Sequence, residues 1–466
     1  MINFEELRRV HCVGIGGIGL SAIAQILINM GIEVSGSEMK ESEITDKLIS
    51  QGANIFLGHR EKNVRGADLL VYSAAVSPDN PELRFAEENG IPIYTRAQML
   101  GALMVGANNS IAIAGAHGKT TTTSMISLIL DNANKEPTIL VGGNLSEIGG
   151  NVKVGKNEFF VTEACEYMDS FLSLLPKYAI ILNIDSDHLD YFKDIDHIVR
   201  SFEHFANLVP EDGAVFAYDA NPFVSSITRK LDRKCITYGF HANCDYRAFD
   251  ISFSQEGMPI FSVEVNGEFL CRIELSIPGE HNIGNSLAAI ACCHYMGIDI
   301  EVITSTLKNF TGTQRRFDVL GNTSSGIMIV DDYAHHPAEI TATIKAARNI
   351  PHKNMWVLFQ PHTYTRTRAL HDDFAVSLAA ADKVVLAEIY AAREKNIHRI
   401  SSKSIVGKIK EIYPNKEVYY FKEFDEIARF VENNAEDGDL VITMGAGDIY
   451  KVGESIMEDD RPGYVR

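Results

Sequence analysis

Paired cysteines, signal sequences and long apolar runs are missing from this sequence of 466 residues. Its seven cysteines include no C-x-x-C pair, which is not the pattern of a disulfide scaffold or a thiolate metal site, so we expect reduced thiols. No run of about 18 apolar residues occurs, and the first residues lack the basic and apolar segments of a signal peptide. These absences predict a cytoplasmic protein without a membrane span.

Positive charge is also scarce. Lys and Arg number 43 against 62 Asp and Glu, which gives a formal net charge of −19. Nucleic acids and anionic membranes are bound by clustered cations, so this balance argues against both as partners. A small phosphorylated ligand needs only a few local cations and stays compatible with the composition.

A first glycine-rich turn, with the pattern G-x-G-x-x-G, occupies residues 14–19 between an apolar run at 10–13 and a helical pattern at 20–30. Glycines permit a tight turn, and the start of a helix attracts a diphosphate. An NAD site also needs an acid at the end of the second strand. That strand is predicted at 32–36, where Ser35 and Ser37 precede Glu38, so the pattern favours a nucleotide other than NAD. An NAD-dependent oxidoreductase stays open as an alternative.

A second glycine-rich turn occupies residues 115–120, between a strand predicted at 111–114 and a helix rich in threonine. Only two residues separate its first glycine from the Gly-Lys-Thr, where the usual P-loop has four. Backbone N–H groups of such a turn wrap phosphates, while Lys119 neutralises the β and γ charge and Thr120 holds Mg²⁺. The sequence therefore predicts a nucleotide phosphate site.

Metal ligands are predicted at the ends of two neighbouring strands. Glu163 ends a strand at 158–164, and His188 follows a strand at 179–185. The carboxyl ends of parallel strands meet at one edge of a sheet, beside the second turn. We expect Glu163 and His188 to complete the metal site there.

Three polar clusters lie further along the chain. Residues 279–285 place a histidine and two asparagines at a helix start, and residues 331–337 and 360–368 end two strands of the last domain. Two such clusters at adjacent strand ends of one domain favour a ligand site.

The order of these elements predicts the fold. At roughly 100–200 residues per domain the length predicts about three domains. Apolar strands, glycine turns and helices recur, which indicates an α/β protein with parallel sheets. We expect a Rossmann-like N-terminal domain at 1–106, a P-loop-type, nucleotide-binding central domain at 107–312, and a Rossmann-like, doubly wound C-terminal domain at 313–466. Residues from about 214 to 275 alternate in polarity, which suggests antiparallel hairpins.

Taken together, these motifs resemble the three-domain Mur ligases of peptidoglycan synthesis, over essentially the whole chain. The specific strings are Gly-Ala-His-Gly-Lys-Thr-Thr-Thr from residue 115, Asp-Asp-Tyr-Ala-His-His-Pro from 331, and Gln-Pro-His-x-Tyr-Thr-Arg-Thr from 360. The chain is most similar to the members that join L-alanine to UDP-N-acetylmuramate. The resemblance implies an ATP- and Mg²⁺-dependent ligase that acts through an acyl phosphate, as a monomer or a homodimer.

The resemblance also implies a role for individual residues. The UDP part of the substrate would lie at Gly14, Gly16, Gly17, Ile18, Gly19, Ser37 and Ser73. ATP would lie at Gly115, Ala116, His117, Gly118, Lys119, Thr120, Thr121, His281, Asn282, Asn285, Arg316 and Asp332. Mg²⁺ would be held by Thr120, Glu163 and His188, and the amino acid and carboxylate by Tyr333, His335, His362 and Arg366. Lys119, His188, His335 and Arg366 would form the catalytic set.

Two positions depart from the family pattern. Many members carry Glu-Ala-Asp-Glu-Ser-Asp where this chain has Cys165, Glu166 and Tyr167 after the first Glu-Ala, and many carry an arginine where it has Thr363. The second change removes one cation near the substrate, so Arg366 or Arg368 would carry more of the carboxylate recognition.

Two further alternatives stay open. A sister ligase that attaches a recycled tripeptide to the same sugar nucleotide shares nearly every motif. A nucleotide-binding regulatory protein without catalysis is disfavoured by Lys119, Glu163 and His188.

Overall fold

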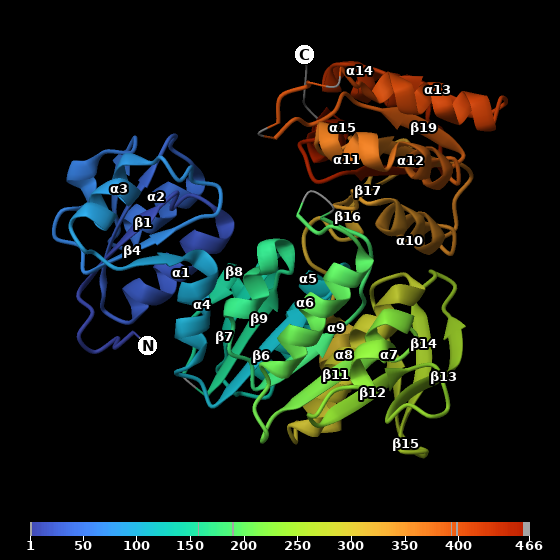
Figure 1. Cartoon of the computed structure of the whole chain (residues 1–466). Helices are drawn as coiled ribbons and strands as arrows, with labels where there is room; N and C mark the ends of the chain where they lie inside the picture. Colours follow the sequence, from blue (N-terminus) through green and yellow to red (C-terminus); the bar gives the residue numbers. More distant parts are fainter. Residues whose placement is uncertain (1, 157, 189–190, 393, 398, 460–466) are drawn as a thin grey trace. The chain divides into compact units, whose positions relative to one another are not determined.

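The computed structural model describes residues 2–156, 158–188, 191–392, 394–397 and 399–459 (Figure 1). The chain divides into two compact units. The first comprises Met1–Ala248, Val263–Cys271 and Gly284–Thr306, and the second comprises Phe249–Ser262, Arg272–Ile283 and Leu307–Arg466. None of the helices in the described ranges is long and apolar enough to span a membrane.

The first sheet has five parallel strands in the order β3-β2-β1-β4-β5. They are β1 (Arg9–Val13), β2 (Glu33–Glu38), β3 (Asn54–Leu57), β4 (Leu69–Tyr72) and β5 (Ile93–Thr95). The helices are α1 (Ile18–Asn29), α2 (Glu43–Ser50), η1 (Glu61–Val64), α3 (Pro81–Glu88) and α4 (Arg96–Met104). Because Val13 is paired with Ser37, the turn after β1 leaves the sheet at the carboxyl ends of its strands.

The second sheet has ten strands in the order β15-β14-β13-β12-β11-β10-β6-β9-β7-β8. They are β6 (Asn109–Ala114), β7 (Thr138–Leu145), β8 (Gly150–Lys153), β9 (Phe159–Ala164), β10 (Tyr178–Ile181), β11 (Ala214–Tyr218), β12 (Cys235–Gly239), β13 (Tyr246–Phe253), β14 (Pro259–Val265) and β15 (Glu268–Glu274). The helices along this stretch are α5 (Lys119–Asn132), η2 (Ser146–Ile148), η3 (Tyr167–Ser173), α6 (Ile195–Asn207), α7 (Pro222–Thr228), α8 (Glu280–Tyr295) and α9 (Ile300–Asn309).

The expectation of antiparallel hairpins from about residue 214 is wrong for its first part. Strand β11 pairs in parallel with β10, and β12 pairs in parallel with both β11 and the start of β13. Alternating polarity shows that one face of a strand is less buried, and it does not report the direction of the neighbouring strand.

The third sheet has six strands in the order β16-β17-β21-β18-β19-β20. They are β16 (Asp318–Asn322), β17 (Met328–Asp332), β18 (Met355–Phe359), β19 (Lys383–Leu386), β20 (Glu417–Tyr420) and β21 (Leu440–Met444). The helices are α10 (Pro337–Ala347), α11 (Tyr364–Ala369), α12 (His371–Leu378), α13 (Ser402–Ile412), α14 (Phe424–Asn434) and α15 (Tyr450–Asp459). Only β16, at the edge, pairs antiparallel among the strand pairs of this sheet that the structure describes.

Strand β18 shows why this domain is doubly wound. Met355, Val357 and Phe359 pack into one apolar cluster, and Trp356 and Leu358 pack into another. Successive side chains of a strand point to opposite faces, so both faces of the sheet are buried and need covering helices. The expected α/β class with a doubly wound last domain is confirmed.

Candidate active site

The first glycine turn is held by the end of β2. The N–H groups of Gly14 and Ile15 donate to the carbonyl oxygen of Ser37 at 2.9 and 3.2 Å, and Gly14 has a φ of +77° that favours glycine. The N–H of Gly16 donates to the Glu38 carboxylate at 3.0 Å. Glu38 is the last residue of β2, so the expectation that this strand end lacks an acid is wrong. A ribose of either NAD or UDP could use that acid, which therefore does not distinguish the two nucleotides.

A buried carboxylate, Glu82, is bonded to Ser37, the residue that holds the first glycine turn. Glu82 and Ser37 are fully buried, and the Ser37 hydroxyl donates to Glu82 at 2.5 Å. The Asn63 amide donates to the other oxygen at 2.7 Å, and His59 lies 3.2 Å from the carboxylate. Burial alone would raise the pKa of Glu82, but contacts with His11, Ser37 and Asn63 outweigh it and lower the pKa to about 2. Glu82 is therefore ionised in the folded protein at neutral pH.

The other residues expected to hold UDP surround the start of α1. Gly17 is the N-cap of this helix, Ile18 is exposed, and Gly19 lies against the side chain of Arg96. The N–H of Ser73 donates to the carbonyl oxygen of Val13 at 3.2 Å, which places Ser73 just after β4 and beside the turn.

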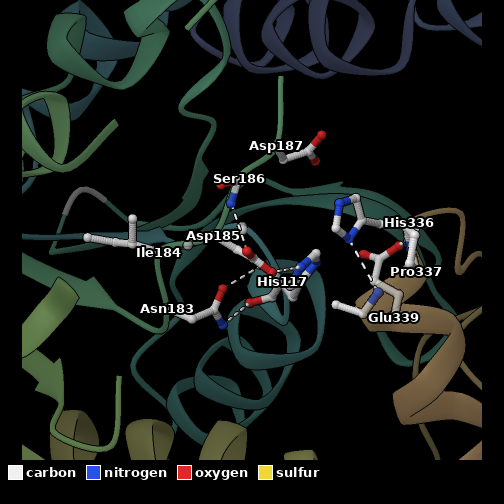
Figure 2. Close-up of polar contacts among 12 residues, drawn as sticks. His117, Asn183, Ile184, Asp185, Ser186, Asp187, His336, Pro337 and Glu339 are labelled. Carbon is white, nitrogen blue, oxygen red and sulfur yellow. Dashed lines mark hydrogen bonds and ion pairs between the residues drawn. The ribbon is translucent and has the colours of Figure 1, made fainter. Parts of the chain in front are cut away.

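The second glycine turn connects β6 to α5. Gly115 and Gly118 have φ values of +151° and +85°, which a side chain would strain. The Asn183 amide accepts from the N–H of His117 and donates to its carbonyl oxygen, both at 2.9 Å (Figure 2). The Asn285 side chain lies directly against Gly118, so the structure places Asn285 at the second glycine turn.

Lys119 begins α5 and is held inside the second turn. Its ammonium group donates to the carbonyl oxygens of Gly115 and Ala116 and to both carboxylate oxygens of Glu166, the latter at 3.1 and 2.9 Å. Burial would lower the pKa of Lys119, but the charge of Glu166 outweighs it and raises that pKa. Lys119 is therefore a charged ammonium at neutral pH.

The residues expected to hold the metal follow the strand ends of the second sheet. Ala114 of β6 is paired with Ala164 of β9, so Glu163 lies at the edge of the sheet where the second glycine turn begins. Its carboxylate accepts from the N–H of Gly142 at 2.6 Å and keeps further lone pairs. Thr120 is buried at the start of α5, and the His188 ring lies 4.0 Å from Glu166 and against Tyr167. Hydroxyl and carboxylate oxygens with one imidazole suit a divalent cation.

In the second unit, two arginines flank the end of β17. The guanidinium of Arg315 donates to Asp331 at 3.0 Å and to the Gly445 carbonyl oxygen at 2.6 Å, and both Arg315 and Arg316 lie 5.0 Å from the ring centre of Tyr333. Asp332 accepts from the N–H groups of Phe317 and Ala334, each at 2.7 Å. Burial raises the pKa of Asp332 to about 6, although Arg316 acts against this rise.

The structure brings together the four residues expected at the amino-acid pocket. The ring centres of Tyr333 and His335 lie 5.4 Å apart, and those of His335 and His362 lie 6.0 Å apart. The His362 Nδ1 atom is 3.5 Å from the Arg366 guanidinium. Burial and the Arg366 charge lower the pKa of His362 to about 4, so its ring is neutral at pH 7. Thr363 has a φ of +64°, which is rare for a β-branched residue.

Residues 280–283 belong to the second unit, whereas Asn285 belongs to the first. Asn282 is buried there and donates to the Pro278 carbonyl oxygen at 2.7 Å, and His281 lies against Gly279. His336 caps α10 together with Glu339, whose carboxylate accepts from the N–H of His336 at 3.3 Å (Figure 2).

Sequence reasoning missed three residues of the first unit, Glu166, Asn183 and Arg96. Asn183 lies near the end of the strand predicted at 179–185, and the observed strand β10 (Tyr178–Ile181) ends before it, so its position was a usable signal. Glu166 reaches Lys119 through η3, in which Met168 and Asp169 have φ values of +53° and +54°, and no periodic pattern announces that geometry.

Comparisons with known proteins give the same assignment along the chain. Three family models match, described as the Mur ligase family catalytic domain at residues 9–107, the Mur ligase middle domain at 113–293 and the Mur ligase glutamate ligase domain at 315–447. Two relatives named UDP-N-acetylmuramate–L-alanine ligase are similar. The one from Caldanaerobacter subterraneus is 50% identical over 460 residues, 99% of each chain, and the one from Alkaliphilus metalliredigens is 49% identical over 455 residues, 98% of each chain.

Among solved structures, a UDP-N-acetylmuramate-alanine ligase from Thermotoga maritima has a TM-score of 0.81 and 30% identity, over 97% of this chain and 98% of that one. The two glycine turns, the strand-end acids and the three consecutive domain matches therefore have one explanation. The chain belongs to the Mur ligase family.

Proposed function

We propose that the chain is the ATP-dependent ligase that joins L-alanine to the lactyl carboxylate of UDP-N-acetylmuramate in peptidoglycan precursor synthesis. The observation that carries this is the second glycine turn, which holds a buried ammonium, Lys119, where the phosphates of ATP would lie. Relatives that match 99% and 98% of the chain at 50% and 49% identity carry the corresponding name. We expect the reaction to take place in the cytoplasm, where ATP is available.

Amide formation from a carboxylate needs activation, because the carboxylate is anionic and oxide is a poor leaving group. A lactyl oxygen attacks the γ-phosphorus of ATP, ADP leaves, and an acyl phosphate forms. The amine of L-alanine then attacks the acyl carbon, and inorganic phosphate leaves with the bonding electrons. Lys119 lowers the repulsion between the anionic partners and stabilises charge in the phosphoryl-transfer step.

We assign Mg²⁺ to Thr120, Glu163 and His188, whose oxygen and nitrogen donors follow neighbouring strand ends. A bound divalent cation would neutralise phosphate charge and orient the γ-phosphoryl group. The Glu166 carboxylate lies 2.9 Å from the Lys119 nitrogen and 4.0 Å from a ring nitrogen of His188, so its negative charge acts on both residues.

The amino-acid side of the reaction is assigned to the second unit. The Arg366 guanidinium holds a carboxylate by two parallel hydrogen bonds, which a lysine cannot reproduce. His362 is a weak base because its pKa is lowered to about 4. We assign His335, whose Nδ1 atom lies 3.3 Å from the Glu339 carboxylate, as the acceptor of the amine proton. Arg316 and Asp332 contact the nucleotide in this proposal.

The test is phosphate release by the purified chain with ATP, UDP-N-acetylmuramate and each amino acid in turn, and with the recycled tripeptide as the competing substrate. Turnover with L-alanine is expected, and none with the tripeptide. Preferred use of the tripeptide would assign the chain to the sister ligase, and NAD⁺ binding without phosphate release would contradict the proposal. The boundaries at residues 106 and 312 stay proposals, which limited proteolysis would test.

A further inference from the structure

Arg96 is the first residue of α4, and its side chain lies across the start of α1. A side chain at Gly19 would meet the Arg96 Cδ atom at 3.0 Å and its Nη1 atom at 3.2 Å. Gly19 is in the first turn of α1 and is not among the glycines with a positive φ. The glycine is therefore needed for the space that the guanidinium occupies, and not for a special backbone conformation.

This guanidinium is partly buried and makes no hydrogen bond or ion pair with any residue that the structure describes. Two arginines of the same domain are paired, since Arg9 lies 3.2 Å from Glu33 and Arg84 lies 2.5 Å from Asp79. The arginines at 8, 60 and 65, which have no ion pair among the described residues, are exposed to water, unlike Arg96. Acidic residues outnumber basic ones 62 to 43, so partners are plentiful. A cation withdrawn from water without a counter-ion is costly, which indicates an anionic ligand.

Unused backbone donors lie beside Arg96. The N–H groups of Ile18 and Gly19 have no acceptor among the described residues, as expected for the first turn of a helix. The Arg96 guanidinium from α4 and the two N–H groups at the start of α1 together form a set of donors for phosphate oxygens.

The charge of Arg96 also acts on Cys165, which lies just after β9 in the first unit. Burial and Glu166 raise the pKa of Cys165, and Lys119 and Arg96 act in the opposite direction. Cys165 directly precedes Glu166, the partner of Lys119. In addition, the Asn151 amide donates to the Ile18 carbonyl oxygen at 3.2 Å, so the start of α1 contacts strand β8.

We propose that Arg96, placed by Gly19, binds the diphosphate of the sugar-nucleotide substrate together with the N–H groups that begin α1. This inference rests on the proposed function, because it takes a uridine diphosphate as the ligand of the first turn. Arg96 is a binding residue in this role: it neutralises the diphosphate and fixes the direction in which the sugar leaves the turn.

The test measures dissociation constants of UDP and of uridine for the full-length chain by calorimetry. Arg96→Gln should weaken UDP binding roughly 10- to 100-fold, the scale of charge-assisted hydrogen bonds, and leave uridine binding within about twofold. Arg96→Lys should have an intermediate affinity for UDP, because lysine keeps the positive charge and lacks the paired N–H donors of a guanidinium. Arg84→Gln, a paired surface arginine of the same domain, is the matched control and should bind UDP like the parent.

Gly19→Ala supplies an independent variant, since its methyl group would displace the guanidinium without altering Arg96. It should also weaken UDP binding, and adding Arg96→Gln should cause little further loss. The KM for UDP-N-acetylmuramate should rise in both variants, with the KM values for ATP and L-alanine unchanged. Parent-like UDP affinity in Arg96→Gln, or equal losses for UDP and uridine, would overturn the inference. A parent that binds neither UDP nor UDP-N-acetylmuramate would overturn the proposed function itself.

Discussion

In the turn after β1 a backbone N–H group already donates to a carboxylate, whereas in the turn after β6 two carbonyl oxygens hold an ammonium group. Gly16 is bonded to Glu38 in the first turn, and Lys119 is bonded to Gly115 and Ala116 in the second. Both turns join a parallel strand to a helix, so glycine-rich geometry alone does not fix the charge at the site. The neighbouring side chains set that charge.

Each turn also has a buried carboxylate behind it, and the two carboxylates differ in their partners. Glu82 is bonded by groups of the domain itself, the Ser37 hydroxyl and the Asn63 amide, with the His11 and His59 rings at 3.6 and 3.2 Å, and no ligand group is needed to satisfy it. Glu166 is bonded by Lys119, a cation that the phosphates of ATP would also attract. The first carboxylate therefore belongs to the scaffold, and the second would share its partner with the nucleotide of the proposed function.

The largest expected effect is the loss of the cation from the second turn. Lys119→Ala should lower kcat roughly 1000-fold or more, because no other side chain of the turn can neutralise the β and γ oxygens. Phosphate release at saturating substrates measures it, and circular dichroism checks that the fold is intact. Lys153→Ala, which removes a lysine paired with Asp131 in the same domain, should keep normal turnover. A near-normal rate in Lys119→Ala would refute the assignment of the phosphate site.

Removing the buried carboxylate near the first glycine turn should lower the stability of the protein. Glu82→Gln leaves donors facing an amide, and we expect a loss of about 2–4 kcal/mol in the free energy of unfolding, which ATP does not restore. The pKa of Glu82 is about 2 in the folded protein and about 4.5 ordinarily, so its ionised form stabilises the fold above pH 4.5. The difference between parent and variant should shrink as the pH falls from about 4.5 towards 2. A difference that does not depend on pH would contradict this.

The sequence was sufficient to locate the two turns because glycine spacing and flanking apolar runs are local features. It also predicted site roles for Lys119, Glu163 and Arg366 through motifs that lie next to predicted strands, and these roles stay predictions. The end of β2 was misplaced because polar residues follow Val34, yet pairing of Glu38 with Leu57 of β3 extends the strand. The end of β2 is set by pairing with residues about 20 positions further along the chain, and a short stretch of sequence does not show such pairing.

The edge strand β16 was also missed, for a related reason. It has no continuous apolar run, Val319 is exposed, and its register shifts between Val319 and Gly321. Arg96 gave no signal because its significance depends on Gly19, which is distant in sequence and adjacent in space. Pairwise geometry of this kind is what the structure adds to the sequence.

The comparison between the two carboxylates becomes sharper with Glu166→Gln. Without a nucleotide, Lys119 would lose its carboxylate partner, and we expect the free energy of unfolding to fall by about 2 kcal/mol. ATP supplies new anionic partners, so it should stabilise the variant more than the parent. Thermal unfolding with and without ATP measures both effects, and the Glu82→Gln variant is the control in which ATP gives no extra gain. An equal ATP-induced shift in Glu166→Gln and parent would show that Glu166 and the phosphates do not share Lys119.

The smallest expected effect concerns Glu38, whose carboxylate accepts from the N–H groups of Gly16 and Met39. An ionised carboxylate has about four acceptor positions, so two are left for the ribose hydroxyls of a bound uridine nucleotide. Glu38→Gln keeps an acceptor for Gly16 and loses the charge, so UDP affinity should fall by about 1 kcal/mol, roughly fivefold. The parent should bind 2′-deoxyuridine diphosphate more weakly than UDP, and the variant should bind the two almost equally. Tighter UDP binding by the variant, with a gain that disappears at high ionic strength, would show instead that Glu38 only repels the diphosphate, because salt screens repulsion between exposed charges.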